Sequence, residues 1–481
     1  MGAQRKLSRV HGRVALAVVA VFLAAAVPAQ AAKPLRVKGG AIVDDKGRTV
    51  VLHGVNVVFK RPPYVPHGKA ERTSFTARDA ARLRSWGFNT VRLGMSWKAL
   101  MPTPGVVDRA YLSKVLAITK LLDAKAIYYL LDMHQDMWSE RFEGNGAPDW
   151  ATKDDGIPFS SLGGFPLNYA SQAVGRSFTN FYENRDGIRD QYRGAWEAVA
   201  RAVRGKPYAL GFDLMNEPSC ELQVDPPCHI PPFAEAYSRW LLPFYDDLIP
   251  ALKRADPTHP SFYEEAPTVN FGYPALIGRA PLPAWKHRGS VLSHHVYCLT
   301  AFRSVPCSQQ EPDAFREARE STRRNGVAAL ITEFGATEDL AVLRRIVNLA
   351  DRNGEGWQYW QYKTYDDPTT QSSSEPGGAD AESIVDVNGK VKTAKLRVLA
   401  RAYPSRIAGT GATWSYNDRT GRFRMSWRAS PRSVTTVQIP RFRFGRDVRI
   451  VPTGGVRSAV ALGGVVAISA SGRSAITVTP G

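Results

Sequence analysis

Short apolar runs of strand length alternate with amphipathic helical stretches along most of this chain, between about residues 35 and 404. Such alternation is typical of parallel strands joined by crossover helices. The runs expected to be strands are residues 51–56, 90–93, 126–132, 210–214, 261–264, 291–295, 328–332 and 356–360. Eight such strands in sequence predict an α/β fold, a (β/α)8 TIM barrel with long βα loops.

The pattern changes after Pro404. Helical periodicity stops, and short runs rich in Val, Ile, Thr and aromatic residues, such as 465–469 and 475–479, lie between turn residues. This composition predicts a small C-terminal antiparallel β-sandwich domain. We therefore expect the chain to divide into residues 1–31, a barrel in 32–405 and a β-sandwich in 406–481.

The first 31 residues have the features of a secretory signal peptide. Residues 14–27 are apolar but too few to span a membrane comfortably, and Ala29-Gln30-Ala31 is a small-x-small cleavage site. The basic residues that precede the apolar stretch are Arg5, Lys6, Arg9 and Arg13. We expect cleavage and a secreted, extracellular protein. An uncleaved membrane anchor is the alternative.

The chain has four cysteines, which fit an oxidising compartment. Cys220 lies close to Cys228, and Cys298 lies close to Cys307, each pair just after a predicted strand. Two local disulfides are the preferred interpretation, although four cysteines allow three pairings. The C-x-x-C spacing of structural zinc sites is absent, so we expect no metal.

The chain is strongly basic, with a formal net charge of +19. Loss of the four positive charges in residues 1–31 would leave +15. Residues 408–481 contain eleven arginines against two aspartates, which gives this segment a charge of +9. The charge suits attraction to an anionic membrane surface or to acidic glycans. An ordinary solvated surface is the alternative, and no motif indicates nucleic acid.

Two glutamates stand where predicted strands end. Glu217 lies in the sequence Gly-Phe-Asp-Leu-Met-Asn-Glu-Pro (211–218), and Glu333 lies in Ala-Leu-Ile-Thr-Glu-Phe-Gly (329–335). An unpaired carboxylate at the end of a buried strand is costly, so each position suggests a use. Two carboxyl groups in different environments are what glycoside hydrolysis requires. The alternative is that both glutamates form surface or salt-bridge contacts.

Other polar and aromatic residues also stand at strand ends, which is where a barrel places its active site. Together with the Asn-Glu-Pro and Glu-Phe-Gly segments they resemble the family-five glycoside hydrolases over the whole barrel. The residues that carry this resemblance are Arg92, His134, Asn216, Glu217, His295, Tyr297, Glu333 and Trp360.

This resemblance implies that Glu217 and Glu333 are catalytic and that the other six residues, His134 and His295 included, bind the substrate. Glu217 would be the general acid/base and Glu333 the nucleophile of a retaining mechanism that needs no metal or cofactor. Asn216 would hold the sugar 2-hydroxyl, and Trp360 would form a sugar platform. Arg92 and Tyr297 would flank the nucleophile, with the charge of Arg92 lowering the pKa of Glu333.

Narrower motifs are similar to those of endoglycoceramidases, which also carry a C-terminal β-sandwich. They are Gly-Val-Asn-Val-Val-Phe-Lys-Arg-Pro-Pro-Tyr-Val-Pro (54–66), Leu-Asp-Met-His-Gln-Asp (131–136) and Gly-Ala-Pro-Asp-Trp (146–150). The similarity implies cleavage of the β-glycosidic bond between oligosaccharide and ceramide in glycosphingolipids. It also implies that Lys60 and Asp136 bind sugar hydroxyls. The alternatives are an exposed Lys60 and an Asp136 that caps the next segment.

Other functions stay open on the sequence alone. The same chemistry could act on galactosylceramide-linked glycans or on steryl glucosides. A cellulase-type endo-β-glucanase and a non-catalytic glycolipid-binding protein are further alternatives. We expect a monomer. The preferred head group, any need for detergent or an activator, and the role of the loop in residues 219–232 do not follow from the sequence.

Overall fold

The computed structural model describes residues 32–221, 237–298, 304–369, 378–445 and 447–481. The predicted signal peptide lies outside these residues, as does most of the loop in residues 219–232. Lys33–Gly481 forms one compact unit. Within the described ranges, no helix is both long and apolar enough to cross a membrane.

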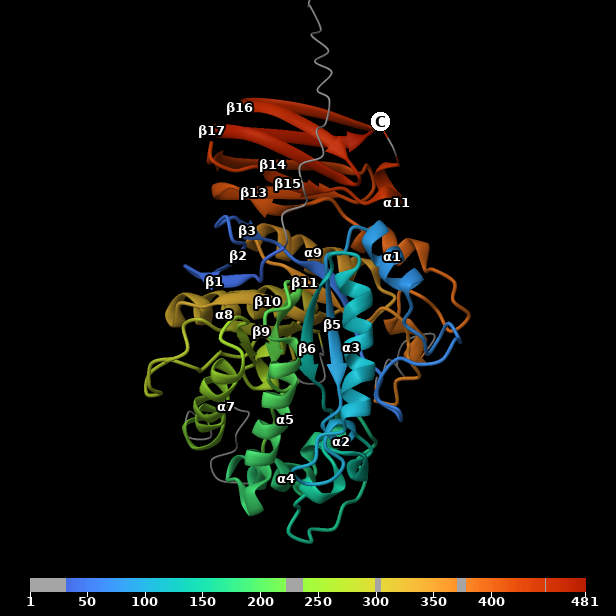
Figure 1. Cartoon of the computed structure of the whole chain (residues 1–481), viewed down its shortest axis with the longest axis vertical. Helices are drawn as coiled ribbons and strands as arrows, with labels where there is room; N and C mark the ends of the chain where they lie inside the picture. Colours follow the sequence, from blue (N-terminus) through green and yellow to red (C-terminus); the bar gives the residue numbers. More distant parts are fainter. Residues whose placement is uncertain (1–31, 222–236, 299–303, 370–377, 446) are drawn as a thin grey trace, which may run out of the picture. The chain divides into compact units, whose positions relative to one another are not determined.

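Eight parallel strands close into a barrel, which confirms the predicted fold (Figure 1). They are β4 (His53–Val57), β5 (Thr90–Met95), β6 (Tyr128–Met133), β7 (Ala209–Asp213), β8 (Ser261–Tyr263), β9 (Val291–Val296), β10 (Ala328–Phe334) and β11 (Trp357–Tyr359). Helices cover the barrel, and strands enclosed in this way are expected to be apolar on both faces. The strands are indeed buried along almost their whole length.

The main covering helices lie in the amphipathic stretches between the strands. They are α1 (Ala77–Ser85), α3 (Arg109–Asp123), α5 (Ile188–Val203), α7 (Leu242–Ala255), α8 (Cys307–Asn325) and α9 (Leu340–Asn353). Aspartates begin two of them. Asp108 accepts hydrogen bonds from the first backbone amides of α3, and Asp339 does the same for α9.

The C-terminal region is an antiparallel sheet, as predicted. Its strands are β12 (Tyr403–Ile407), β13 (Gly409–Asn417), β14 (Arg422–Ala429), β15 (Thr435–Gln438), β16 (Val448–Leu462) and β17 (Val465–Pro480). The runs 465–469 and 475–479, expected as separate strands, are one strand, β17. Its first part pairs with β15 and its last part with β14, so β17 continues from one half of the sheet into the other. Side chains of both halves share one apolar cluster.

Three short strands near the N-terminus belong to this sheet and not to the barrel: β1 (Arg36–Lys38), β2 (Ala41–Val43) and β3 (Thr49–Val50). β3 pairs with β12, and Figure 1 shows β1–β3 between the barrel and the other sheet strands. Ile42, Val50 and Leu52 pack against side chains near the amino ends of barrel strands, such as Leu130 and Leu330. The sheet therefore covers the amino-terminal end of the barrel and leaves the carboxyl ends of the strands to other residues.

Candidate active site

Glu217 and Glu333 face each other at the carboxyl ends of β7 and β10. One carboxylate oxygen of each, together with a ring nitrogen of His295, lies within 4.8 Å of the others. Retaining glycosidases hold their two carboxyl groups about 5–5.5 Å apart, and inverting enzymes about 6.5–9.5 Å apart. This upper limit on the distance between the two oxygens lies below the range of the inverting class and is compatible with the retaining class.

The backbone of Glu217 is held in the left-handed region, with φ at 44°. This conformation is uncommon for a residue with a side chain and persists where surrounding contacts fix it. The Glu217 amide donates to Oε2 of Glu264 at 3.0 Å. Its carbonyl accepts from Nε2 of Gln135 at 3.0 Å. Two buried side chains on neighbouring strand ends thus fix the direction of the Glu217 carboxylate.

One oxygen of Glu217 receives two hydrogen bonds. Nδ2 of Asn270 donates to Oε1 at 3.1 Å, and Nδ1 of His295 lies 2.9 Å from the same atom. The Asn270 amide is oriented unambiguously, because its Oδ1 accepts from the backbone N–H of His295. Burial opposes protonation of His295, but the charges of Glu264 and Glu333 raise its pKa well above the usual value. The raised pKa favours the protonated imidazole, in which both ring nitrogens are donors.

Glu333 is surrounded by donors. Its Oε1 accepts from Nη1 of Arg92 at 2.5 Å, and its Oε2 accepts from the Tyr297 hydroxyl at 3.1 Å. Burial nevertheless raises the pKa of Glu333, and the charges of His295 and Arg92 only oppose this rise. The charge of Arg92 lowers this pKa, as expected, but the side chain is only 7% exposed and desolvation outweighs the attraction.

Arg92 is fully buried and touches several acids at once. Its guanidinium lies 2.8 Å from Asp213, 3.0 Å from Asp132 and 2.9 Å from Oδ1 of Asn216. Burial, with only partial compensation by Arg92, raises the pKa of Asp213 to about 8. One arginine thus holds Glu333 and Asn216 in a fixed relation, and the strand-end residues Asp132 and Asp213 hold the arginine.

Lys60 and Asp136 are buried partners, which excludes the exposed-lysine alternative. Nζ of Lys60 lies 2.8 Å from Asp136, 3.0 Å from Asp367 and 2.7 Å from the Thr369 hydroxyl. The side chain of Asn145 also donates to Asp136 at 2.7 Å. The contacts of the Asp136 carboxylate with Lys60 and Asn145 are not helix caps. This Lys60 cluster supplies both donors and acceptors of the kind that sugar hydroxyls bind.

Trp360 lies beside the Lys60 cluster just after β11. Nζ of Lys60 is 4.6 Å from the centroid of the indole ring, and the His134 ring stacks on it at 5.3 Å. The indole N–H donates to Glu382 at 2.6 Å. Burial lowers the pKa of His134, but the charges of Asp132 and Asp136 raise it to about 9. Only 4% of Trp360 is exposed, so little of the ring is open for a sugar platform in this structure.

The sequence interpretation overlooked several residues of the site. Glu264 ends a predicted strand, which is the signal that identified Glu217 and Glu333, and it could have been found in the same way. Asp213 lies in the Glu217 motif itself. Asn270 lies in the short 3-10 helix η6 (Pro267–Phe271) and Asp367 in a loop, and neither segment has a periodic pattern that would mark the residue in the sequence.

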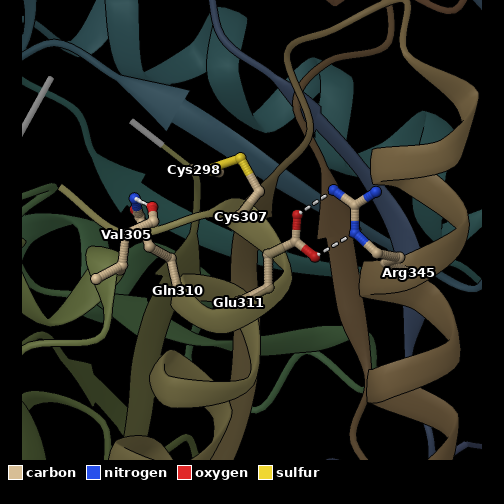
Figure 2. Close-up of a disulfide and its surroundings, with 6 residues drawn as sticks. All are labelled: Cys298, Val305, Cys307, Gln310, Glu311 and Arg345. Atoms are coloured by element: carbon tan, nitrogen blue, oxygen red, sulfur yellow. Dashed lines mark hydrogen bonds and ion pairs between the residues drawn. A yellow bond between two sulfur atoms is a disulfide. The ribbon is translucent and has the colours of Figure 1, made fainter. Parts of the chain in front are cut away.

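A disulfide joins Cys298 to Cys307, as predicted (Figure 2). Cys298 directly follows Tyr297, and Cys307 begins α8. The next turn of α8 is fixed to α9, because Arg345 forms two hydrogen bonds with Glu311, each of 2.9 Å. The disulfide thus connects the Tyr297 segment to a braced helix. Cys228 lies outside the described residues, so the Cys220–Cys228 pairing stays a prediction.

Replacing both bridged cysteines, C298S/C307S, should lower the free energy of unfolding by about 2–3 kcal/mol, as expected for closing a loop of this length. Differential scanning calorimetry under non-reducing conditions would measure the change. An unaltered Tm would mean that the bridge contributes nothing to folding.

The Tyr297 hydroxyl should affect the pH dependence. Hydrogen bonding to a carboxylate favours its ionised form, so Y297F should raise the pKa of Glu333 further. The acid limb of the kcat/KM profile should then move to higher pH, by about one pH unit for one lost hydrogen bond. Y208F, on a tyrosine at the amino end of β7, is the control. An acid limb that stays in place in Y297F would contradict the assignment of this limb to Glu333.

Comparison with known proteins agrees with this geometry. Residues 43–366 match the model of the cellulase family (glycosyl hydrolase family 5), and residues 401–478 match the glycoside hydrolase family 5 C-terminal domain. Endoglycoceramidase I of Rhodococcus hoagii is 32% identical over 426 residues, covering 85% of this chain and 79% of the relative. Endoglycoceramidase of Cyanea nozakii is 30% identical over 448 residues, covering 85% of each.

A solved structure is also similar. It is Endo-glycoceramidase II from Rhodococcus sp. as a lactosyl-enzyme intermediate, with a TM-score of 0.73 and 25% identity. The match covers 92% of this chain and 99% of that one. The family models, the relatives and the fold all indicate the same family. This chain is a glycoside hydrolase and belongs to glycosyl hydrolase family 5, with endoglycoceramidases among its relatives.

Proposed function

We propose that this enzyme is a retaining endoglycosidase that cleaves the β-glycosidic bond between oligosaccharide and ceramide in glycosphingolipids. The observation that carries the proposal is the close Glu217–Glu333 pair, in a chain that is at least 30% identical to two endoglycoceramidases. The carboxylate separation supports double displacement, and the family relationship supports the substrate.

The first step forms one bond and breaks another. The Glu333 carboxylate attacks the anomeric carbon, and the bond from that carbon to the ceramide oxygen breaks. Glu217 gives its proton to the departing oxygen, so ceramide leaves as a neutral alcohol. In the second step Glu217 takes a proton from water, the water oxygen bonds to the anomeric carbon, and Glu333 leaves as a carboxylate. The lactosyl-enzyme intermediate of the Rhodococcus sp. enzyme supports such a covalent step here.

The hydrogen bonds at Glu217 determine which oxygen carries the proton. Oε1 accepts from both Asn270 and His295, so its two lone pairs are occupied. A proton on Oε1 would break one of these bonds. We therefore assign the acid proton to Oε2, which is the oxygen that would face the ceramide oxygen.

Asn270 should accordingly matter most when the leaving group is poor. N270A removes one donor from Oε1 and lets the proton exchange between the two oxygens. We expect kcat/KM to fall about tenfold or more on a ceramide-linked glycan, the value of a hydrogen bond to a charged group. Activity on a 2,4-dinitrophenyl glycoside, which leaves without protonation, should change less than threefold by the same reasoning. Equal losses on both substrates would show a merely structural role.

The Lys60 cluster is the proposed recognition site for the first sugar. The three N–H donors of Lys60 are engaged by Asp136, Asp367 and Thr369, so a sugar hydroxyl that accepts from Lys60 would replace one of these partners while it donates to Asp136 or Asp367. Because these charges are buried, a sugar that left one of them unpaired would bind poorly. Burial opposes the charged form of Asp136, but Lys60 and His134 hold its pKa well below the usual range. The side chains of the cluster are thus already charged at neutral pH before a sugar binds.

A direct substrate test decides between the candidates. The enzyme would be incubated with a fluorescent-ceramide ganglioside, glucosylceramide, a steryl glucoside and carboxymethyl-cellulose, and both products of each reaction would be identified. Intact oligosaccharide and free ceramide from the ganglioside support the proposal. Preferential cleavage of the steryl glucoside or of cellulose would replace it with that activity, and E333Q serves as the blank.

We also propose that residues 1–31 are removed on export and that the mature enzyme is an extracellular monomer. The basic, apolar and small-x-small segments of the sequence support this. N-terminal sequencing of protein from culture medium should begin near Ala32, and light scattering should give the monomer mass. An intact N-terminus on cell-bound protein would instead indicate an anchor.

A further inference from the structure

Arginines surround a cavity that lies outside the catalytic centre. The cavity has a volume of about 740 Å³ and is lined by residues of α9 and of the hairpin of β13 and β14. Among them are Arg344, Asn417, Asp418, Arg419, Arg422 and Arg424. This volume is within the range of about 300–1,000 Å³ that small-molecule sites occupy. The lining holds four arginines against one aspartate.

The single acid neutralises only one of these arginines. Oδ2 of Asp418 lies 2.8 Å from Nε of Arg344. Within the described ranges, no carboxylate lies within ion-pairing distance of the side chains of Arg419, Arg422 or Arg424. Three positive charges therefore face the cavity without compensation, and repulsion between them would be relieved by a bound anion.

The alternation of the β14 strand explains why the arginines gather here. Phe423 and Met425 point into the core, so Arg422 and Arg424 project to the opposite face. Ser415 and Asn417 on β13 pair directly with Arg424 and Arg422, which places neutral hydrogen-bonding groups beside each guanidinium.

The hairpin tip is already ordered for binding. Oδ1 of Asn417 accepts from the amides of Arg419 and Thr420 at 3.0 Å each. The guanidinium of Arg443 donates to the carbonyls of Asp418 and Arg419 at 2.7 Å and 2.5 Å. Arg443 is thus a structural residue, and the tip needs little ordering when a ligand binds.

We infer that this cavity binds an acidic saccharide, a small sugar that carries a carboxylate. Guanidinium groups match a carboxylate with two parallel hydrogen bonds. The neutral part of the lining is mostly polar, with two asparagines, a serine and a threonine beside Tyr416, and suits sugar hydroxyls better than an apolar ligand. This inference assigns part of the surplus basic charge of the C-terminal segment to one cavity and to one class of ligand.

The same charge could in principle attract an anionic membrane, but the shape favours a small ligand. The groups are arranged around a concave site, whereas a flat lipid surface would engage the exposed arginines of β14 and β17 equally. Arg428 and Arg473, which pair across these strands, are exposed and lie outside the cavity. They provide a matched control of the same charge.

The test compares two double variants, R422Q/R424Q and R428Q/R473Q. Glucuronate, glucose, inorganic phosphate and phosphatidylserine vesicles would be titrated into each enzyme by calorimetry and ligand-observed NMR. We expect glucuronate to bind better than glucose or phosphate. R422Q/R424Q should weaken it about tenfold or more, whereas R428Q/R473Q should change it less than twofold. Binding should also weaken with salt.

Other results would overturn the inference. Equal losses in the two variants would indicate diffuse surface charge, and binding of vesicles alone would indicate membrane docking. Phosphate binding as tight as glucuronate binding would show that the cavity recognises an anion and not a saccharide. No binding at all would leave the cavity without this function. Turnover of a soluble aryl glycoside and the Tm should stay unchanged in both variants, which separates a lost ligand site from a damaged enzyme.

Discussion

The Glu333→Gln variant should lose turnover on every glycoside, whatever its leaving group. The amide keeps the shape of the side chain but cannot attack the anomeric carbon, so no glycosyl-enzyme forms. We expect kcat to fall by at least about 10⁴-fold, in the range found when a covalent nucleophile is removed. Steady-state rates on a ceramide-linked glycan and on a 2,4-dinitrophenyl glycoside would both show this.

The variant should remain folded. Burial raises the pKa of Glu333, so the ionised carboxylate is disfavoured in the native state. A group of this kind costs stability as the pH rises above its unfolded pKa, and a neutral amide removes that cost. We therefore expect an equal or higher Tm at pH 7. Glu320→Gln, a surface substitution on α8, is the control. Residual turnover of the activated substrate near wild-type rates would reassign the nucleophile.

The sequence predicts the barrel well because the barrel depends on a strong local signal. Each buried parallel strand is a mainly apolar run, and polar residues within or just after several of these runs are brought to one mouth by the fold. Glu217 and Glu333 lie more than a hundred positions apart, yet closure of the barrel makes them neighbours. Their pairing follows from topology once the eight strands are recognised.

The short strands could not be predicted in the same way. β1–β3 contain only two or three residues each, so no alternating pattern can develop. They form because pairing with β12 and burial against the barrel end stabilise them, which is a tertiary effect. Gly472 led to the opposite error, a strand break predicted where the structure has none. Ser471-Gly472-Arg473 resembles a turn, but the strand continues through it.

The electrostatics of the site also lay beyond the sequence. The charge of Arg92 lowers the pKa of Glu333, as the sequence suggested, but burial raises this pKa by more, and only the structure shows the depth of burial. Lys60 and Asp136 were expected to bind sugar. The structure shows that they bind each other and Asp367 as well, so the sugar must join an existing network instead of meeting two free groups.

The Glu217→Ala variant should separate the two chemical steps. Ceramide is a poor leaving group, so without the acid its departure should slow by about 10²–10⁴-fold, the usual contribution of general acid catalysis. A 2,4-dinitrophenyl glycoside leaves without a proton, so the glycosyl-enzyme should still form at a substantial rate. Hydrolysis of the glycosyl-enzyme should then limit the rate, because no general base remains to take a proton from the attacking water.

Azide should restore turnover of the activated substrate in Glu217→Ala. The azide anion needs no base, fits the space left by the deleted carboxylate and attacks the anomeric carbon of the glycosyl-enzyme. The product should be the β-glycosyl azide, because two inversions retain the configuration, and NMR of the product would show this. Since Asn270 and His295 both donate to the deleted group, loss of folding must be excluded by an unchanged Tm. A folded variant that azide fails to rescue, or an α-glycosyl azide as product, would contradict the assignment of Glu217 as the acid/base.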